Sequence, residues 1–180
     1  GNEKPGFTQP IYVHQHWHVD ISYIKILGSM YFLITVLDGR SRYVLAHDLR
    51  LHMSEYDVEV VIQRAKERFP DVKPRIISDN GPQFISRDFK EFIRSSEYSH
   101  VRTRPYYPQS NGKMERFYGT IKSEEIRRRS YLSLDDARRS INRYVRYYNT
   151  KRLHSSIYFL TPEDVLLDRI GERLKERQQK

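Results

Sequence analysis

The sequence predicts an α/β domain in which helices cover both faces of one mixed sheet. Three short apolar segments separated by turn residues come first, between residues 17 and 51, and they indicate an antiparallel meander. Segments with helical spacing then alternate with two more short apolar segments, an order typical of helices packed on a sheet. At 180 residues, the chain has the length of one ordinary domain.

The meander is defined by alternation and by two turns. Val19, Ile21 and Tyr23 are spaced by two, as expected for a strand with one face buried. Gly28 then turns the chain into a second segment, and the pair Asp38-Gly39 turns it into a third. The middle segment is apolar without interruption, so we expect both of its faces to be covered.

Helix and strand signals alternate after the meander. Ser54 with Asp57, and Ser133 with Asp136, have the spacing of capping boxes, and a proline follows Thr161 at a first helical position. In chain order we expect a helix from Ser54, a strand over 75–78, a helix over 86–94, a strand over 99–102, a loop over 103–112, a long helix over 111–128, and helices from Ser133 and Thr161.

Charge and composition narrow the function classes. The net charge is +9; residues 1–100 carry 13 basic and 13 acidic side chains, whereas residues 101–180 carry 19 and 10. The second part is therefore expected to meet a polyanion such as nucleic acid. The chain has no cysteine, which excludes disulfides and thiolate metal sites. Its longest apolar runs fall far short of the ~20 residues that span a bilayer, so no membrane partner is expected.

Three carboxylates occupy unusual positions. Asp20 lies in an apolar strand, Asp79 follows a buried strand, and Glu115 begins a helix after a loop. A buried lone carboxylate costs several kcal/mol unless it is paired or bound to a metal. A salt bridge or a helix cap would explain any one of them. A shared hard cation such as Mg²⁺ would explain all three, because this ion prefers oxygen ligands.

The residues around these acids form motifs with a defined spacing, since Asp79 and Glu115 are 36 positions apart. The motifs are Trp17-His18-Val19-Asp20, Ser78-Asp79-Asn80-Gly81-Pro82-Gln83-Phe84 and Tyr107-Pro108-Gln109-Ser110-Asn111-Gly112-Lys113-Met114-Glu115-Arg116-Phe117. Together they resemble the catalytic core of retroviral integrases and of the related bacterial insertion-sequence transposases, the DDE family. The bacterial version is also similar at Tyr148-Asn149, Arg152, His154-Ser155 and Leu160-Thr161-Pro162, but departs at Leu153 and at Tyr158-Phe159.

The resemblance implies a ribonuclease H-like fold, a mixed five-stranded sheet flanked by helices, with Asp20 and Asp79 on adjacent strands. It implies phosphoryl transfer with two Mg²⁺ ions, or Mn²⁺ as a substitute, in which Asp20 bridges the ions and Asp79 and Glu115 each complete one shell. The implied reaction nicks DNA at element ends and joins the 3′-hydroxyl to target DNA. The implied setting is a homo-oligomer on the nucleoid, in the bacterial cytoplasm.

The same resemblance divides the chain into a flexible arm over 1–15, a catalytic core over 16–167 and a charged tail over 168–180. Lys122, two helical turns after Glu115, is a candidate to hold a DNA phosphate, although a solvated lysine is equally expected. The other candidate DNA-binding residues are Gln109 and Asn111 in the loop, and Arg138, Arg139 and Arg143 on the following helix.

Three alternatives stay open. His14, His16 and His18 alternate, so on one strand they would share a side and could bind zinc. A catalytically silent DNA-binding or assembly module of the same fold is a second alternative, which the joint presence of the three acids opposes. A metal-dependent nuclease of this fold is the third, and Glu124 or Glu125 would be its fourth carboxylate.

Overall fold

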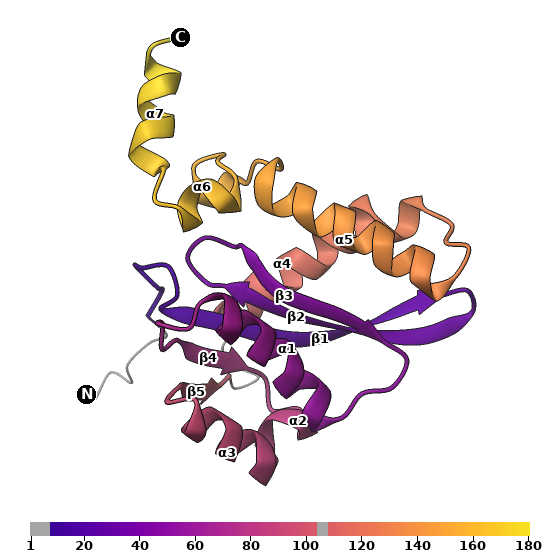
Figure 1. Cartoon of the computed structure of the whole chain (residues 1–180). Helices are drawn as coiled ribbons and strands as arrows, with labels where there is room; N and C mark the ends of the chain where they lie inside the picture. The colour runs from indigo at the N-terminus through magenta and orange to yellow at the C-terminus, as the bar shows by residue number, and fades with distance from the viewer. Residues whose placement is uncertain (1–7, 104–107) are drawn as a thin grey trace.

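One mixed sheet organises the protein (Figure 1). The structure, a computed structural model, describes residues 8–103 and 108–180, and of residues 108–111 it describes the backbone alone. The strands are β1 (His16–Ile26), β2 (Ser29–Asp38), β3 (Val44–Arg50), β4 (Arg75–Ser78) and β5 (Ser99–Arg102). Their order is β3-β2-β1-β4-β5; β1 to β3 are antiparallel, and β4 and β5 run parallel to β1. This is the five-stranded mixed sheet that the sequence predicts.

Helices cover both faces of the sheet, with α1 to α3 on one side and α4 and α5 on the other (Figure 1). The helices are α1 (Glu55–Arg68), α2 (Pro82–Ile85), α3 (Arg87–Ser95), α4 (Pro108–Glu124), α5 (Leu134–Thr150), α6 (Pro162–Leu166) and α7 (Ile170–Gln178). Two 3₁₀ turns, η1 (Ile126–Arg128) and η2 (Ser155–Ile157), follow α4 and α5. Within residues 8–103 and 108–180, no helix is long and apolar enough to cross a membrane.

The alternation of side chains along β1 supplies two separate cores. Trp17 and Val19 pack with residues of α1 and α3, whereas Ile24 and Ile26 pack with residues of α4 and α5. Successive strand residues point to opposite faces, so Asp20, in step with Ile24 and Ile26, lies on the α4 face of the sheet.

The predicted helix starts at Ser54 and Thr161 are confirmed as capping boxes. At Ser133 the hydroxyl accepts from Asp136 N at 3.0 Å, as predicted. The Asp136 carboxylate, however, accepts from Leu132 N at 2.8 Å instead of from the cap residue. The reciprocal bond is therefore shifted by one residue, and each bond still satisfies a backbone N–H at the helix start.

Three boundaries differ from the prediction. Helix α4 begins at Pro108, inside the expected loop over 103–112, because proline is well tolerated in a first helical turn. Its regular part ends at Glu124, and the 3₁₀ turn η1 follows. The region expected only as a charged tail contains α7, where Arg173 pairs with Asp164 of α6 at 3.0 Å.

Candidate active site

Two of the three acids meet at one edge of the sheet. The parallel ladder between β1 and β4 pairs His18 with Ile77. Asp20 lies two residues beyond His18, and Asp79 lies two residues beyond Ile77, so Asp20, inside β1, lies level with Asp79 just past the end of β4. The predicted placement of Asp20 beside Asp79 on a parallel neighbour is therefore what the strand register produces.

A tight turn after β4 positions Asp79. Gly81 N donates to Asp79 Oδ1 at 2.8 Å and so fixes the orientation of this carboxylate. A Cβ atom at Gly81 would stand 3.0 Å from Asp79 Oδ1, so a larger residue would crowd the carboxylate. Asn80 Nδ2 donates to Thr103 O at 3.1 Å and connects this turn to the segment after β5.

Helix α4 carries Glu115 and Lys122 and is anchored directly to β1. Tyr118 donates its hydroxyl hydrogen bond to Asp20 O at 2.7 Å, and Leu33 O lies 3.1 Å from the same hydroxyl. Glu115 is exposed and Lys122 is half-buried, which leaves their heads accessible beside the sheet edge. The buried side of the helix consists of Met114, Phe117, Tyr118 and Ile121.

The pKa of Asp20 shows that the charges of Asp79, Glu115 and Lys122 lie close enough to act on it. Burial above all, together with the negative charges of Asp79 and Glu115, raises the pKa of Asp20 to about 6. A hydrogen bond from the Ile21 backbone and the positive charge of Lys122 act in the opposite direction on this pKa. Four side-chain charges from β1, the β4 turn and α4 therefore interact across one small region.

The three carboxylates are close enough to interact but are not assembled around one point. Within residues 8–103 and 108–180, no three His, Cys, Asp or Glu side chains are arranged to hold a single metal ion. Mutual repulsion favours separation of like charges. The donor set itself is three carboxylates, which are the oxygen ligands that hard divalent cations such as Mg²⁺ take. The residues therefore suit Mg²⁺ in chemistry.

Tyr118, which directly follows the motif that ends at Phe117, is a positioning residue. Its burial and the nearby charge of Asp20 raise the pKa of the phenol well above its ordinary value, so the hydroxyl stays a donor. The available signal was a tyrosine in an otherwise apolar stripe with Met114, Phe117 and Ile121. A buried tyrosine hydroxyl usually finds a hydrogen-bond partner.

The predicted DNA-binding arginines divide into two groups. Arg139 and Arg143 are exposed on α5. Arg138, expected to face solvent or phosphate, instead donates from Nη2 to Leu49 O at 2.9 Å, with Asp135 3.7 Å away. Helical spacing cannot show that a strand carbonyl lies within reach, and contact of Arg138 with DNA stays a prediction. The side chains of Gln109 and Asn111 lie outside the described residues, and their backbone belongs to α4 instead of a loop.

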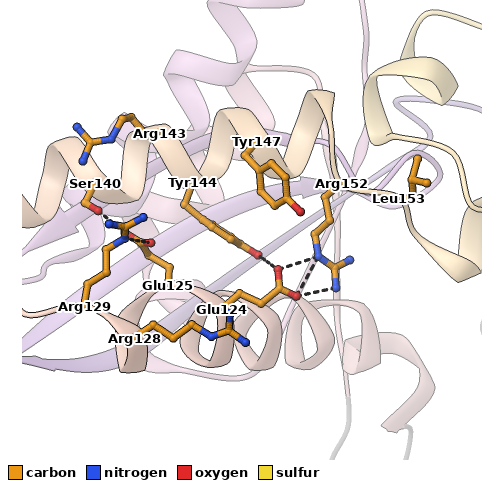
Figure 2. Close-up of a pocket in the computed structure, with 10 residues that line it drawn as sticks. All are labelled: Glu124, Glu125, Arg128, Arg129, Ser140, Arg143, Tyr144, Tyr147, Arg152 and Leu153. Atoms are coloured by element: carbon orange, nitrogen blue, oxygen red, sulfur yellow. Dashed lines mark hydrogen bonds and ion pairs between the residues drawn. The ribbon is translucent and has the colours of Figure 1, made fainter.

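Glu124 and Glu125 are committed to other partners, so neither serves as a fourth carboxylate at the site. Arg152 donates to Glu124 Oε2 at 2.8 Å, and Tyr144 donates to Glu124 Oε1 at 2.9 Å (Figure 2). Glu125 is buried and accepts from Arg129 Nε at 2.8 Å (Figure 2). Both carboxylates line a cavity of about 740 Å³ between α4 and α5.

The three histidines do not share one side of a strand. His14 precedes β1 with a φ of 64°, and its Nδ1 accepts from Trp17 Nε1 at 3.0 Å. Its ring stacks on Phe69 with centroids 4.4 Å apart. His16 and His18 belong to β1 itself. The expected alternation fails at His14 because the left-handed residue turns the chain before the strand begins.

Comparison with known proteins agrees with this geometry. An integrase core domain model matches residues 12–108, and a second integrase core domain model matches residues 96–162. The chain belongs to the integrase core domain family. This integrase core is 27% identical over 150 residues to the transposase of insertion sequence element IS904 from Lactococcus lactis, covering 82% of this chain. It spans 59% of the length of that transposase.

Solved structures share the fold of this integrase core. The integrase catalytic core domain of HTLV-2, solved with magnesium in a dimeric form, superimposes with a TM-score of 0.69 at 22% identity, covering 87% of this chain and 98% of that one. A chain of the simian T-cell lymphotropic virus intasome superimposes with a TM-score of 0.76 at 20% identity, covering 91% of this chain and 59% of that one. The ribonuclease H-like fold that the motifs imply is confirmed by these neighbours.

Proposed function

We propose that this integrase core is the catalytic part of a transposase, which nicks DNA at element ends and joins the exposed 3′-hydroxyl to target DNA. The observation that carries the proposal is the placement of three carboxylates in one region: Asp20 on β1, Asp79 in the turn after β4, and Glu115 on α4, which Tyr118 bonds to Asp20 O at 2.7 Å. The charges of Asp79 and Glu115 both act on Asp20. The family models together span residues 12–162, which supports a catalytic core over about 16–167.

Asp20, Asp79 and Glu115 would hold the divalent metal, Mg²⁺ or Mn²⁺. When bound, two such ions activate an attacking water or hydroxyl and stabilise the oxygen that leaves phosphorus. The magnesium named for the HTLV-2 core, a protein of the same fold, supports this choice. The raised pKa of Asp20 supports it too, because that carboxyl keeps a pKa near 6 until positive charge is supplied.

The remaining residues orient the reacting groups. Tyr118 fixes α4 against the backbone of Asp20, and so sets the position of Glu115 relative to the sheet. The bond from Gly81 N holds one oxygen of Asp79 and so fixes the orientation of that carboxylate. Lys122, whose positive charge is felt at Asp20, would hold a phosphate of the DNA next to the acids.

The expected partners are DNA and further copies of the chain. The net charge of +9 supports a polyanionic substrate, and the excess lies entirely in residues 101–180. Named dimeric and trimeric forms of the HTLV-2 core, and an intasome among the structural neighbours, support an oligomer on DNA. The bacterial transposase relative supports action on the nucleoid.

The proposal is tested with purified protein and labelled duplex DNA that carries element ends. We expect nicked and joined products with Mg²⁺ or Mn²⁺, and DNA binding without turnover in Ca²⁺, because the larger ion tolerates looser coordination. Product that forms equally well in excess chelator would overturn the mechanism. The matched control is Glu91→Gln, which removes one exposed carboxylate of α3 without touching the site.

The same experiment separates the alternatives. Nicks without joined strands would identify a nuclease, whereas binding without any turnover in Mg²⁺ would identify a silent module. The structure gives no support to the nuclease, because Glu124 and Glu125 are held by Arg152 and Arg129.

A further inference from the structure

A second cluster of charge lies on another side of α4. Here a cavity of about 110 Å³ is enclosed by the turn between β2 and β3, by α4, by the end of α5 and by η2. The basic residues that line it are Arg42, Lys113, Arg116 and Arg152, and none of the residues lining it is a carboxylate. We call it the basic pocket.

Among the described residues, three of the four basic side chains of this pocket have no ion-pair partner, although the charge of Asp38 acts on Arg42 and Lys113. Lys113 Nζ donates to Gly39 O at 2.8 Å, and Arg42 donates to the same carbonyl oxygen. Across residues 8–103 and 108–180, Arg42, Lys113 and Arg116 have no carboxylate within 4.0 Å as an ion-pair partner. Arg42, Lys113 and Arg116 therefore share one small cavity, where their like charges repel one another. An anion would relieve this repulsion.

His154 is part of the pocket wall and carries a buried ring nitrogen. The residue is only 7% exposed, and its Nε2 is buried without a hydrogen-bond partner in the described part of the chain. Its ring packs edge-on against Tyr148 with centroids 4.5 Å apart, so the imidazole is fixed in place. Burial, Arg152 and Arg42 lower the pKa of His154 to about 4. A negative ligand would raise that pKa and allow Nε2 to donate.

The larger cavity between α4 and α5 differs from the basic pocket because carboxylates are part of its wall. It is also lined by arginines, but Glu124 and Glu125 are in its wall and pair with Arg152 and Arg129 (Figure 2). Its positive charge is therefore partly neutralised by the protein itself. Among the residues that the structure describes, Arg152 is the only one of the four basic residues of the basic pocket that pairs with a carboxylate.

The volume of the basic pocket limits the ligand to one small group. About 110 Å³ is the space of three to four water molecules at ~30 Å³ each, which suits one tetrahedral anion. Guanidinium groups form paired hydrogen bonds to phosphate oxygens, and the hydroxyls of Ser155 and Ser156 at the exposed rim can add donors. Arg116 is exposed, so an entering group can reach it from solvent.

We propose that the basic pocket binds one phosphate group, supplied by a DNA backbone or by free phosphate. The DNA source rests on the proposed function, whereas the pocket itself does not. Arg116 follows Glu115 directly on α4 but points about 100° away around the helix, so DNA held here and DNA at the acids would contact different sides of the same helix.

Inorganic phosphate is the first probe. Thermal unfolding is compared in phosphate and in chloride at equal ionic strength, without metal. With phosphate about tenfold above its Kd, we expect the midpoint to rise by about 3 to 6 °C. Arg116→Gln, at an exposed position, should remove most of this rise, and Ser156→Ala should reduce it without a change of charge. Arg87→Gln, which removes an exposed arginine of α3, is the matched control and should keep the full rise.

A duplex DNA probe then identifies the source. If the DNA backbone supplies the phosphate, Arg116→Gln should lower the slope of log binding constant against log salt by about 0.9, and Arg87→Gln should not. An unchanged slope with loss of the phosphate effect would assign the pocket to free phosphate. Equal midpoints of the wild type in phosphate and chloride, or equal losses in Arg116→Gln and Arg87→Gln, would overturn the proposal.

The two proposals fail separately. Asp79→Asn leaves the basic pocket untouched and should keep the full phosphate effect, although it loses strand cutting. If wild-type protein shows the phosphate effect and cuts no DNA in Mg²⁺, the proposed function fails and the pocket stands.

Discussion

Two sides of one helix, α4, collect charge of opposite sign. On one side Glu115 joins Asp20 and Asp79, and on another Lys113 and Arg116 line the basic pocket. Burial, assisted by nearby like charges, moves a pKa toward neutrality in both places, to about 6 for Asp20 and to about 7 for Lys113. Each side is costly to the protein alone and becomes favourable with a ligand of opposite charge.

The two sides differ in how much space they leave. Glu115 is exposed at an open sheet edge, where metal ions and a DNA strand can enter together. The basic pocket is enclosed and has a volume of about 110 Å³, so it admits a single small group. Charge thus selects the sign of each ligand, and the shape of the site selects its size.

The largest expected effect comes from removing the acids one at a time. Asp20→Asn, Asp79→Asn and Glu115→Gln should each reduce cutting and joining by at least about 100-fold, because each removes a metal-binding oxygen. Midpoints of thermal unfolding without metal should stay equal or rise, since one like charge is lost. Joining at the wild-type rate by any of the three variants in a labelled-oligonucleotide assay would remove that residue from the site.

Substitution of Lys122 tests whether a positive charge next to the three acids takes part in joining. Lys122→Ala should slow joining by about 10-fold or more, while overall DNA affinity changes by less than about 3-fold, because one charge-assisted bond near the reacting phosphate is lost. Single-turnover joining and equilibrium binding measure the two quantities. Lys25→Ala, at an exposed strand position, is the control. Equal losses of joining and binding would make Lys122 a general DNA contact.

The opposite signs of the two sides predict opposite pH dependences of stability. Asp20 has a folded pKa of about 6 against an ordinary 3.8, so the folded state binds more protons and the free energy of unfolding falls as pH rises from about 4 to 6. Lys113 has a folded pKa of about 7 against 10.5, so the unfolded state binds more protons and the free energy of unfolding rises between about pH 7 and 10.5.

Urea denaturation at a series of pH values checks both contributions. Asp20→Asn should remove the decrease between about pH 4 and 6, which is at most about 1.4 kcal/mol per pH unit. Lys113→Gln should remove the increase above pH 7, whereas Lys25→Gln should keep it. A wild-type pH profile in either variant would show that the corresponding charge is not crowded in the folded state.

The smallest effects are expected on α5, away from both sites. Arg139→Gln and Arg143→Gln should each lower the salt slope of DNA binding by about one unit if they contact phosphates. Arg138→Gln should instead destabilise folding by about 1 kcal/mol, since the buried Leu49 carbonyl loses its donor. Unchanged slopes for Arg139 and Arg143 would place this face of α5 against solvent or another subunit.

Much of the fold follows from local signals that the sequence contains. The capping boxes at Ser54 and Thr161 fix helix starts, and the alternation through Val19 and Ile21 fixes which face each strand residue occupies. Because β1 and β4 are adjacent and parallel, the positions of Asp20 and Asp79 within them determine that the two acids meet. These features need only short-range patterns and one strand register.

The remaining features depend on long-range contacts. The bond from Arg138 to Leu49 joins residues 89 positions apart, and helical spacing carries no sign of it. Likewise, Glu124 as a fourth carboxylate is excluded only by Arg152, which lies 28 positions away. The basic pocket requires residues from four separate segments, so no local motif marks it. Likewise, the alternation of His14, His16 and His18 does not indicate that His14 has a left-handed backbone conformation.

The bond from Tyr118 to Asp20 and Leu33 has a consequence for sequence drift in this fold. The hydroxyl contacts main-chain carbonyl oxygens, and these are present whatever side chains the two strands carry. Neighbouring strand residues can therefore be exchanged through many generations while the distance between helix and sheet is preserved. Loss of the tyrosine hydroxyl, or a slip in strand register, would loosen the helix that carries Glu115 even where its apolar packing is unchanged.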